Sequence, residues 1–224
     1  MRITYSKYGI EQLIEENEVW VICIENRKCF SDIICDLWQQ INGSKGDVIF
    51  SDGNDLIKIN REVEMIFNPY SVDCNEKKIL NALYQEIEDE TNDLLQEEML
   101  QLKSGMIKFM DRIVENNRYS LAFECDIDIV DILKLFSVKI DNMVESVAEN
   151  LLEYIRIKSR LCKTRCFIFV NIKSYISNDE MNGLYEAAFY EKVHLILIEN
   201  TQYESVSGEK ITIIDNDLCF INLN

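Results

Sequence analysis

Three runs of consecutive apolar residues predict the strands of a buried sheet, at residues 19–24, 166–170 and 194–198. A run without polar alternation is typical of a strand that is covered on both faces. Between the second and third runs, Ser177 and Glu180 form the capping box of a helix that continues to about Tyr190. Strand, helix and strand with short connections predict a parallel sheet, so the chain is expected to be of the α/β class.

The hydrophobic period changes after Pro69, the only proline in the chain. Asp73 and Glu76 can begin a helix, and helical character then persists to about Asn116. Apolar residues recur there at spacings of four and three, which is typical of a seam that needs a partner helix. The seam consists of Leu95, Met99, Leu102, Met106, Phe109 and Ile113, and a matching stripe consists of Val144, Val147, Leu151 and Tyr154.

The sequence therefore predicts an α/β head that is interrupted by a helical insertion. The strands of the head come from both ends of the sequence, and the seam and its partner stripe lie between them. We expect the head to comprise residues 1–85 and 159–224 and the helical leg to comprise residues 86–158.

The composition is that of a globular protein. Of the 224 residues, 47% are hydrophobic and 28% are charged, and no apolar run approaches the roughly 18 residues that a membrane span needs. The first residues lack the apolar core of a signal peptide, so we expect a cytoplasmic protein. The eight cysteines include no C-x-x-C pair, which predicts buried free thiols rather than zinc or disulfides.

Catalytic patterns are missing from the sequence. Neither G-x-x-x-x-G-K-[ST] nor G-x-G-x-x-G occurs, and the run 43–46 (GSKG) is expected to be a surface turn. The strand at 166–170 is followed by Asn171, where a nucleotide hydrolase needs an acidic metal ligand. The single histidine, His194, is expected in the core, which leaves no Ser-His or Cys-His pair. We therefore expect no enzymatic activity.

A group of four acids begins a predicted helix and admits two interpretations. Carboxylates two residues apart could bind a hard cation such as calcium, whereas the same residues could cap the helix and complement its dipole. The residues are Glu124, Asp126, Asp128 and Asp131.

The net charge of −17 is unusual for a DNA-binding protein, but the charges are segregated along the chain. Residues 86–98 hold seven acids and no base, whereas residues 156–165 hold five bases and no acid. On a helix, Arg156, Arg160 and Lys163 share one face, which suits either duplex phosphates or complementation of the helix dipole. Lys158 belongs to the same basic stretch, and further candidate contacts in the leg are Lys134 and Lys139.

Several segments resemble the type II-A CRISPR-associated ring-forming adaptation protein family. The resemblance covers essentially the whole chain in the right order, as patterns rather than as catalytic motifs. The segments are VICIEN at 21–26 with Phe30, FNPYSVD at 67–73, FVNIKSYISNDE at 169–180, LIE at 197–199 and IDNDLC at 214–219.

The resemblance implies a nucleotide-hydrolase-like head that lacks a phosphate loop and carries an inserted helical leg. It also implies a calcium-dependent homotetrameric ring that encircles linear double-stranded DNA and accepts the DNA from its ends. Such a ring assists new-spacer acquisition alongside the CRISPR integrase and the effector nuclease. Glu124 and Asp126 fit the family's apolar-Glu-x-Asp pattern of calcium ligands. The alternative is a protein-interaction scaffold that does not bind DNA and whose helical leg drives oligomerisation.

Overall fold

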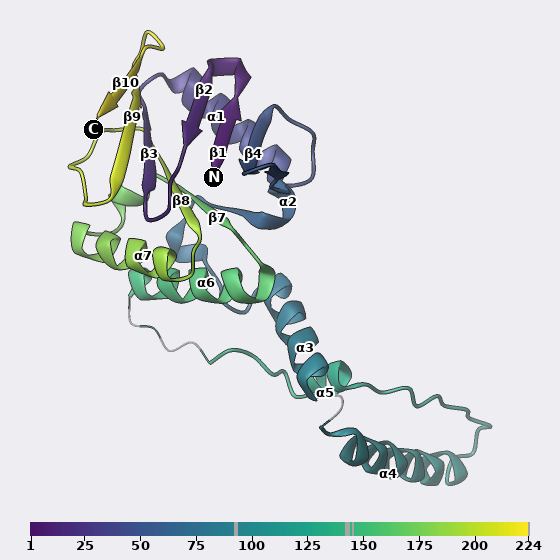
Figure 1. The fold of residues 1–224 in the computed structure, drawn as a ribbon. Coiled ribbons are helices and arrows are strands. Elements are labelled where there is room, and N and C mark those ends of the chain that lie inside the picture. The colour runs from purple at the N-terminus through teal and green to yellow at the C-terminus, as the bar shows by residue number, and fades with distance from the viewer. Residues whose placement is uncertain (92–93, 142–143, 145, 224) are drawn as a thin grey trace. The chain divides into compact units, whose positions relative to one another are not determined.

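A computed structural model describes residues 1–91, 94–141, 144 and 146–223 (Figure 1). The chain divides into two units: unit 1 comprises Met1–Cys74 and Asn142–Asn224, and unit 2 comprises Asn75–Asp141. The helical unit is thus inserted into the α/β unit, as the sequence predicted.

The α/β unit is built on a six-stranded sheet in the order β10-β9-β3-β8-β7-β6. Neighbouring strands are parallel from β9 to β6, and β10 pairs with β9 in the antiparallel direction. The predicted parallel α/β sheet is therefore confirmed. The strands are β3 (Val19–Ile24), β6 (Val63–Ile66), β7 (Cys166–Val170), β8 (His194–Glu199), β9 (Glu209–Ile214) and β10 (Phe220–Leu223).

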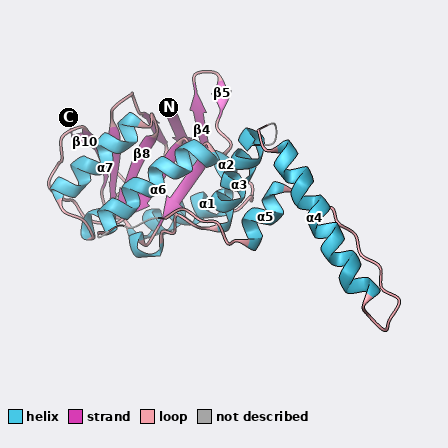
Figure 2. Cartoon of the chain, turned by 90° about the horizontal axis from the view of Figure 1, so that it is seen from below, coloured by secondary structure: helices cyan, strands magenta, loops and turns pink. Residues whose placement is uncertain are grey.

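Helices cover both faces of this sheet, which explains why β3 and β7 are buried along their whole length. On one face Trp20 and Ile22 pack with Ile33 of α1 (Arg27–Ile41). On the other face lie α6 (Val147–Cys162) and α7 (Asn178–Tyr190), which Figure 2 shows side by side across the strands.

A smaller antiparallel sheet in the order β2-β1-β4-β5 packs on the α1 side of unit 1. Ile3, Tyr5 and Phe50 of this sheet join the same hydrophobic core as the central strands. The remaining elements of the unit are β1 (Arg2–Tyr5), η1 (Ser6–Tyr8), β2 (Ile10–Leu13), β4 (Val48–Asp52), β5 (Asp55–Leu56), α2 (Ile59–Glu62), η2 (Pro69–Ser71) and η3 (Ile172–Ser174).

Helix α6 belongs to the α/β unit, which differs from the expected leg boundary at residue 158. Leu151 and Ile155 are fully buried, and the ring of Tyr154 packs edge-on against Phe167 of β7 with centroids 6.5 Å apart. The predicted pairing of this stripe with the seam at 95–113 is therefore wrong, because the stripe already packs on the sheet. Val144 lies outside regular structure.

The helical unit contains α3 (Lys77–Thr91), α4 (Gln96–Glu115) and α5 (Ile129–Leu135). The predicted continuous helix is interrupted at Leu94 and Leu95, and α3 begins at Lys77 rather than at Asp73. The Tyr84 hydroxyl donates to the carbonyl of Val138 at 2.6 Å, and Asn75 exchanges two hydrogen bonds with the backbone of Ile140. These bonds tie α3 to the chain that follows α5.

Helix α4 keeps its apolar seam at the surface of the unit. None of its 20 residues, all of which are described, is buried. Leu102 is 45% exposed, Phe109 is 64% exposed and Ile113 is 42% exposed. The seam therefore lies mostly at the surface of the unit, with only Met99 and Met106 partly buried.

The cysteines agree only in part with the expected buried free thiols. None of them forms a disulfide among the described residues, and Cys23, Cys29, Cys74 and Cys166 are buried. Cys35 and Cys219 are exposed.

Candidate functional site

The predicted DNA-contact face of α6 lies on the surface of the α/β unit. Arg156, Arg160 and Lys163 are all exposed, as their spacing predicted, because the opposite side of the helix packs on the sheet. Two of these cations are engaged with acids. The Arg160 guanidinium forms a bidentate pair with Glu191 of unit 1 at 2.9 and 2.5 Å, and this pairing raises the pKa of Arg160. The Arg156 guanidinium lies 3.5 Å from the Glu153 carboxylate. The acids offset part of the positive charge that phosphate binding would use.

Lys158 is not part of this face. Its side chain is 1% exposed, its Nζ lies 2.8 Å from a carboxylate oxygen of Glu64 on β6, and it sits 5.4 Å above the ring of Tyr154. The prediction that Lys158 contacts DNA is therefore wrong for this fold. The signal was present in the sequence, because Lys158 follows Tyr154 by four residues and so continues the apolar stripe.

The two other predicted contacts lie in unit 2. Lys134 is in the last turn of α5, where a cation complements the helix dipole, and Lys139 follows α5. Both side chains are exposed. The structure leaves both available to a ligand.

The four predicted metal ligands are divided between two roles. Asp128 caps α5 by accepting from the backbone N–H of Asp131 at 2.8 Å, and Asp131 completes the capping box at 3.4 Å. Glu124 and Asp126 are exposed in the irregular segment before α5. Side chains two residues apart on an extended chain are separated by about 6–7 Å. No group of three or more His, Cys, Asp or Glu side chains in the described residues could hold a metal ion. Calcium binding by Glu124 and Asp126 stays a prediction.

The place where a phosphate loop would stand is occupied by a short connection. Only Glu25 and Asn26 separate β3 from α1, and the Asn26 side chain accepts from the N–H groups of Lys28 and Cys29 at 3.1 and 3.0 Å. The helix N-terminus, where phosphates bind in other proteins, is thus capped by the protein itself. The GSKG run at 43–46 is an exposed turn after α1, as predicted.

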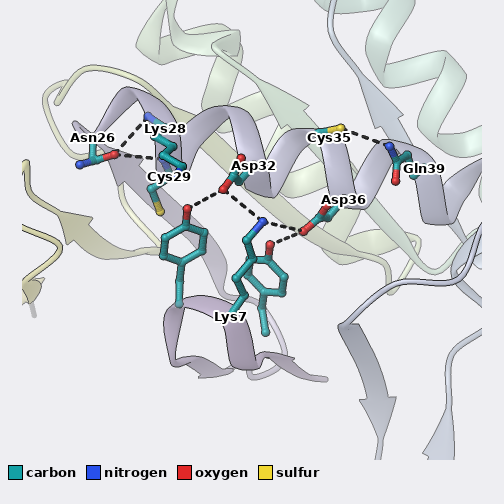
Figure 3. Close-up of polar contacts among 10 residues, drawn as sticks. Lys7, Asn26, Lys28, Cys29, Asp32, Cys35, Asp36 and Gln39 are labelled. Atoms are coloured by element: carbon teal, nitrogen blue, oxygen red, sulfur yellow. Dashed lines mark hydrogen bonds and ion pairs between the residues drawn. The ribbon is translucent and has the colours of Figure 1, made fainter.

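A charged cluster that the sequence analysis missed joins η1 to α1 (Figure 3). Asp32 accepts from the Tyr8 hydroxyl at 2.7 Å and from Lys7 at 3.1 Å, and these bonds lower the pKa of Asp32. The hydrogen bond to Asp32 raises the pKa of Tyr8 to about 12. Lys7 also lies 3.6 Å from Asp36, which accepts from the Tyr5 hydroxyl. The spacing of Asp32 and Asp36 by four residues was the available signal. Because each carboxylate is already bonded, the cluster holds the N-terminal strands on α1.

His194 begins β8 and is partly exposed, rather than buried in the core as expected. It lines a cleft of 530 Å³ at the amino-terminal ends of the parallel strands, together with Asp52, Arg165 and Lys192. Burial lowers the pKa of His194 to about 4, so the imidazole is neutral at neutral pH. Arg165 pairs with Asp52 and lies 3.6 Å from Glu62.

These features define a class of protein: an α/β domain with a parallel sheet, no phosphate loop, and an inserted helical unit. The model of the CRISPR-associated protein family Cas_Csn2 matches residues 40–218, and the chain belongs to this family. The family membership inferred from the sequence is therefore confirmed, and the protein is CRISPR-associated.

Two curated relatives are similar over most of their length. The chain is 25% identical to the CRISPR-associated protein Csn2 of Streptococcus agalactiae over 186 residues, which is 79% of each chain. It is 22% identical to the CRISPR-associated protein Csn2 of Enterococcus faecalis over 205 residues, which is 89% of this chain and 90% of the relative.

Solved structures with a similar course of the chain include ATP-binding cassettes of ABC transporters. A nucleotide-free cassette has a TM-score of 0.46 and 14% identity, and a cassette in an ADP conformation has a TM-score of 0.45 and 13% identity. In both comparisons 96% of this chain and 85% of the other are covered.

None of the described helices is long and apolar enough to cross a membrane.

Proposed function

We propose that this CRISPR-associated protein binds the ends of linear double-stranded DNA without reading its sequence, acts as a ring-shaped homotetramer in the cytoplasm, and thereby assists new-spacer acquisition alongside the integrase and the effector nuclease. The observation that carries the proposal is the family match over residues 40–218. The resemblance of the sequence to the ring-forming adaptation proteins supplies the finer points.

The protein acts without catalysis in this proposal. The capped N-terminus of α1 argues against nucleotide binding, because Asn26 already bonds the N–H groups that a phosphate would use. In the cleft, the neutral His194 lies beside Arg165 and Asp52. Arg165 and Asp52 already form an ion pair with each other, so the Asp52 carboxylate is engaged by the arginine. A ring that holds DNA by its phosphates needs neither a nucleophile nor a general base.

A ring accommodates the acidic composition. Acids outnumber bases in both units, so a uniform surface would repel DNA. Exposed cations such as Lys163, Lys134 and Lys139 would instead have to gather on the inner surface of the assembly, and the acids would face outward. The pairing of Arg156 and Arg160 with acids counts against a large contribution from those two residues.

A scaffold that does not bind DNA is the second candidate. The exposed seam of α4 favours it, because an apolar helix face drives oligomerisation whether or not DNA is bound. The two candidates differ in their response to DNA ends and to salt.

The test is a gel shift that compares linear with covalently closed circular duplex at several salt concentrations. The proposal expects binding to linear DNA alone, with affinity that falls steeply as salt rises. Replacing Arg156, Arg160 and Lys163 by glutamine should weaken binding to all linear sequences equally and lower the salt slope by about one unit, most of it from Lys163. A control that replaces Arg27, Lys28 and Lys45 removes the same charge elsewhere and should leave the slope unchanged. No binding to linear DNA at low salt would favour the scaffold.

A further inference from the structure

The connection between β8 and β9 lacks the helix that usually joins parallel strands. Residues 200–208 cross from the end of β8 to the start of β9 as an irregular segment, which we call the strap. Val206 is its only buried side chain. A cavity of 470 Å³ lies beside the strap and is lined by residues 202–205 together with Ile211 and Leu223. The strap therefore depends on a small number of anchoring contacts.

Two buried charged residues supply central anchors. Lys173 of η3 donates from Nζ to the strap carbonyl of Glu204 at 3.3 Å, and Glu209 of β9 accepts from the strap N–H of Val206 at 3.0 Å. Lys173 and Glu209 pair with each other at 2.6 Å, and their side chains are 4% and 0% exposed. The Tyr185 hydroxyl of α7 donates to the same carboxylate at 2.5 Å.

Glu199, the last residue of β8, adds a second carboxylate to this buried group. It is 0% exposed, and one of its oxygens accepts from the backbone N–H of Lys173 at 3.2 Å. Its other oxygen, Oε2, is buried without a hydrogen-bond partner among the described residues. The ionisable groups that face Glu199 are Lys173, Glu209, Tyr185 and, from the neighbouring strand β3, Cys23.

The charges of this group balance only when Glu199 carries a proton. Lys173 and the Glu209 carboxylate then form a neutral pair. With Glu199 ionised, two buried carboxylates face one ammonium, and an uncompensated buried charge is costly. Burial raises the pKa of Glu199 from 4.5 to about 7, so this change falls near neutral pH.

We propose that the strap is a pH-sensitive element, which is closed while Glu199 is protonated and is loosened when Glu199 ionises beside Glu209. Loosening admits water from the adjoining cavity to the carboxylates, and it breaks the anchors that Lys173 and Glu209 make to the strap backbone. The proposal concerns unit 1 alone and does not depend on DNA binding.

The direction and size of the effect follow from proton linkage. The closed state has a pKa of about 7 for Glu199, and an open, hydrated state has the ordinary value of 4.5, so the closed state binds the proton more tightly. Closure is therefore favoured at low pH and weakened as the pH rises toward and past 7. The opening constant should increase about tenfold between about pH 6 and about pH 8.5.

Hydrogen–deuterium exchange of the full chain tests this directly, after correction for the intrinsic pH dependence of exchange. Protection of residues 200–208 should fall about tenfold over that pH interval in the wild type. In Glu199→Gln, which is always neutral, protection should be the same at both pH values. The matched control Glu204→Gln removes an exposed strap carboxylate and should retain the wild-type pH dependence.

Carbon-13 detection of the glutamate carboxyl groups in the wild type provides a measurement that needs no variant to fold. Glu199 should titrate with a midpoint near 7. A midpoint at the ordinary value of 4.5 would overturn the proposal, as would strap protection that does not change with pH. A pH dependence that persists unchanged in Glu199→Gln would assign the switch to another group and would also overturn it.

Discussion

Replacing Lys158 by methionine distinguishes a structural lysine from a DNA-contacting one. The Nζ atom of Lys158 lies 2.8 Å from the Glu64 carboxylate, with the lysine 1% exposed and the glutamate 21% exposed. Removing one partner of a buried ion pair costs about 3–5 kcal/mol. Because Glu64 keeps some contact with water, we expect the lower end, a loss of about 3 kcal/mol in the free energy of unfolding.

Urea unfolding of the wild type and of Lys158→Met measures this loss as a lower midpoint. Adding Glu64→Gln to the variant should recover much of the stability, since no unpaired carboxylate then remains. Lys163→Met, an exposed residue that caps the same helix, is the control and should change stability by less than about 0.5 kcal/mol. The folded Lys158→Met protein should bind DNA with the wild-type salt slope.

Two results would refute this reasoning. A loss below about 1 kcal/mol would mean that the pair contributes no more than an exposed one. A salt slope lower by about one unit would return Lys158 to the DNA-contacting set.

Three further predictions concern pH, assembly and calcium. Because the pKa of His194 falls from 6.5 to about 4 on folding, wild-type stability should decline as the pH falls between these values. His194→Gln should remove a decline of about 2 kcal/mol, and equal pH profiles in urea melts would contradict this. Phe109→Asp on the exposed seam of α4 should dissociate the proposed tetramer in light scattering while leaving the helical content intact; a variant that remains tetrameric would exclude the seam from the interface. Calcium should raise the melting temperature of the wild type but not of the Glu124→Ala, Asp126→Ala double variant. Equal rises in both proteins would leave these two acids without a role in calcium binding.

The sequence by itself determined the elements whose signals are local. The apolar runs at β3 and β7 predicted fully buried strands, because a strand covered on both faces needs no polar alternation. The capping box of Ser177 and Glu180 marked the start of α7 correctly. The missing phosphate loop and the family resemblance are also properties of the sequence alone.

Only the tertiary structure decided where ambiguous elements pack. The stripe of Leu151 and Tyr154 has a spacing that suits a partner helix or a sheet equally well, and it packs on the sheet. That choice turned Lys158 inward, because a residue four positions after Tyr154 shares its side of the helix. Lys173, Glu199 and Glu209 come from three different elements, so no local pattern could have shown that they meet. Contacts between distant segments depend on how the chain folds back on itself, and the spacing of residues within one element does not specify those contacts.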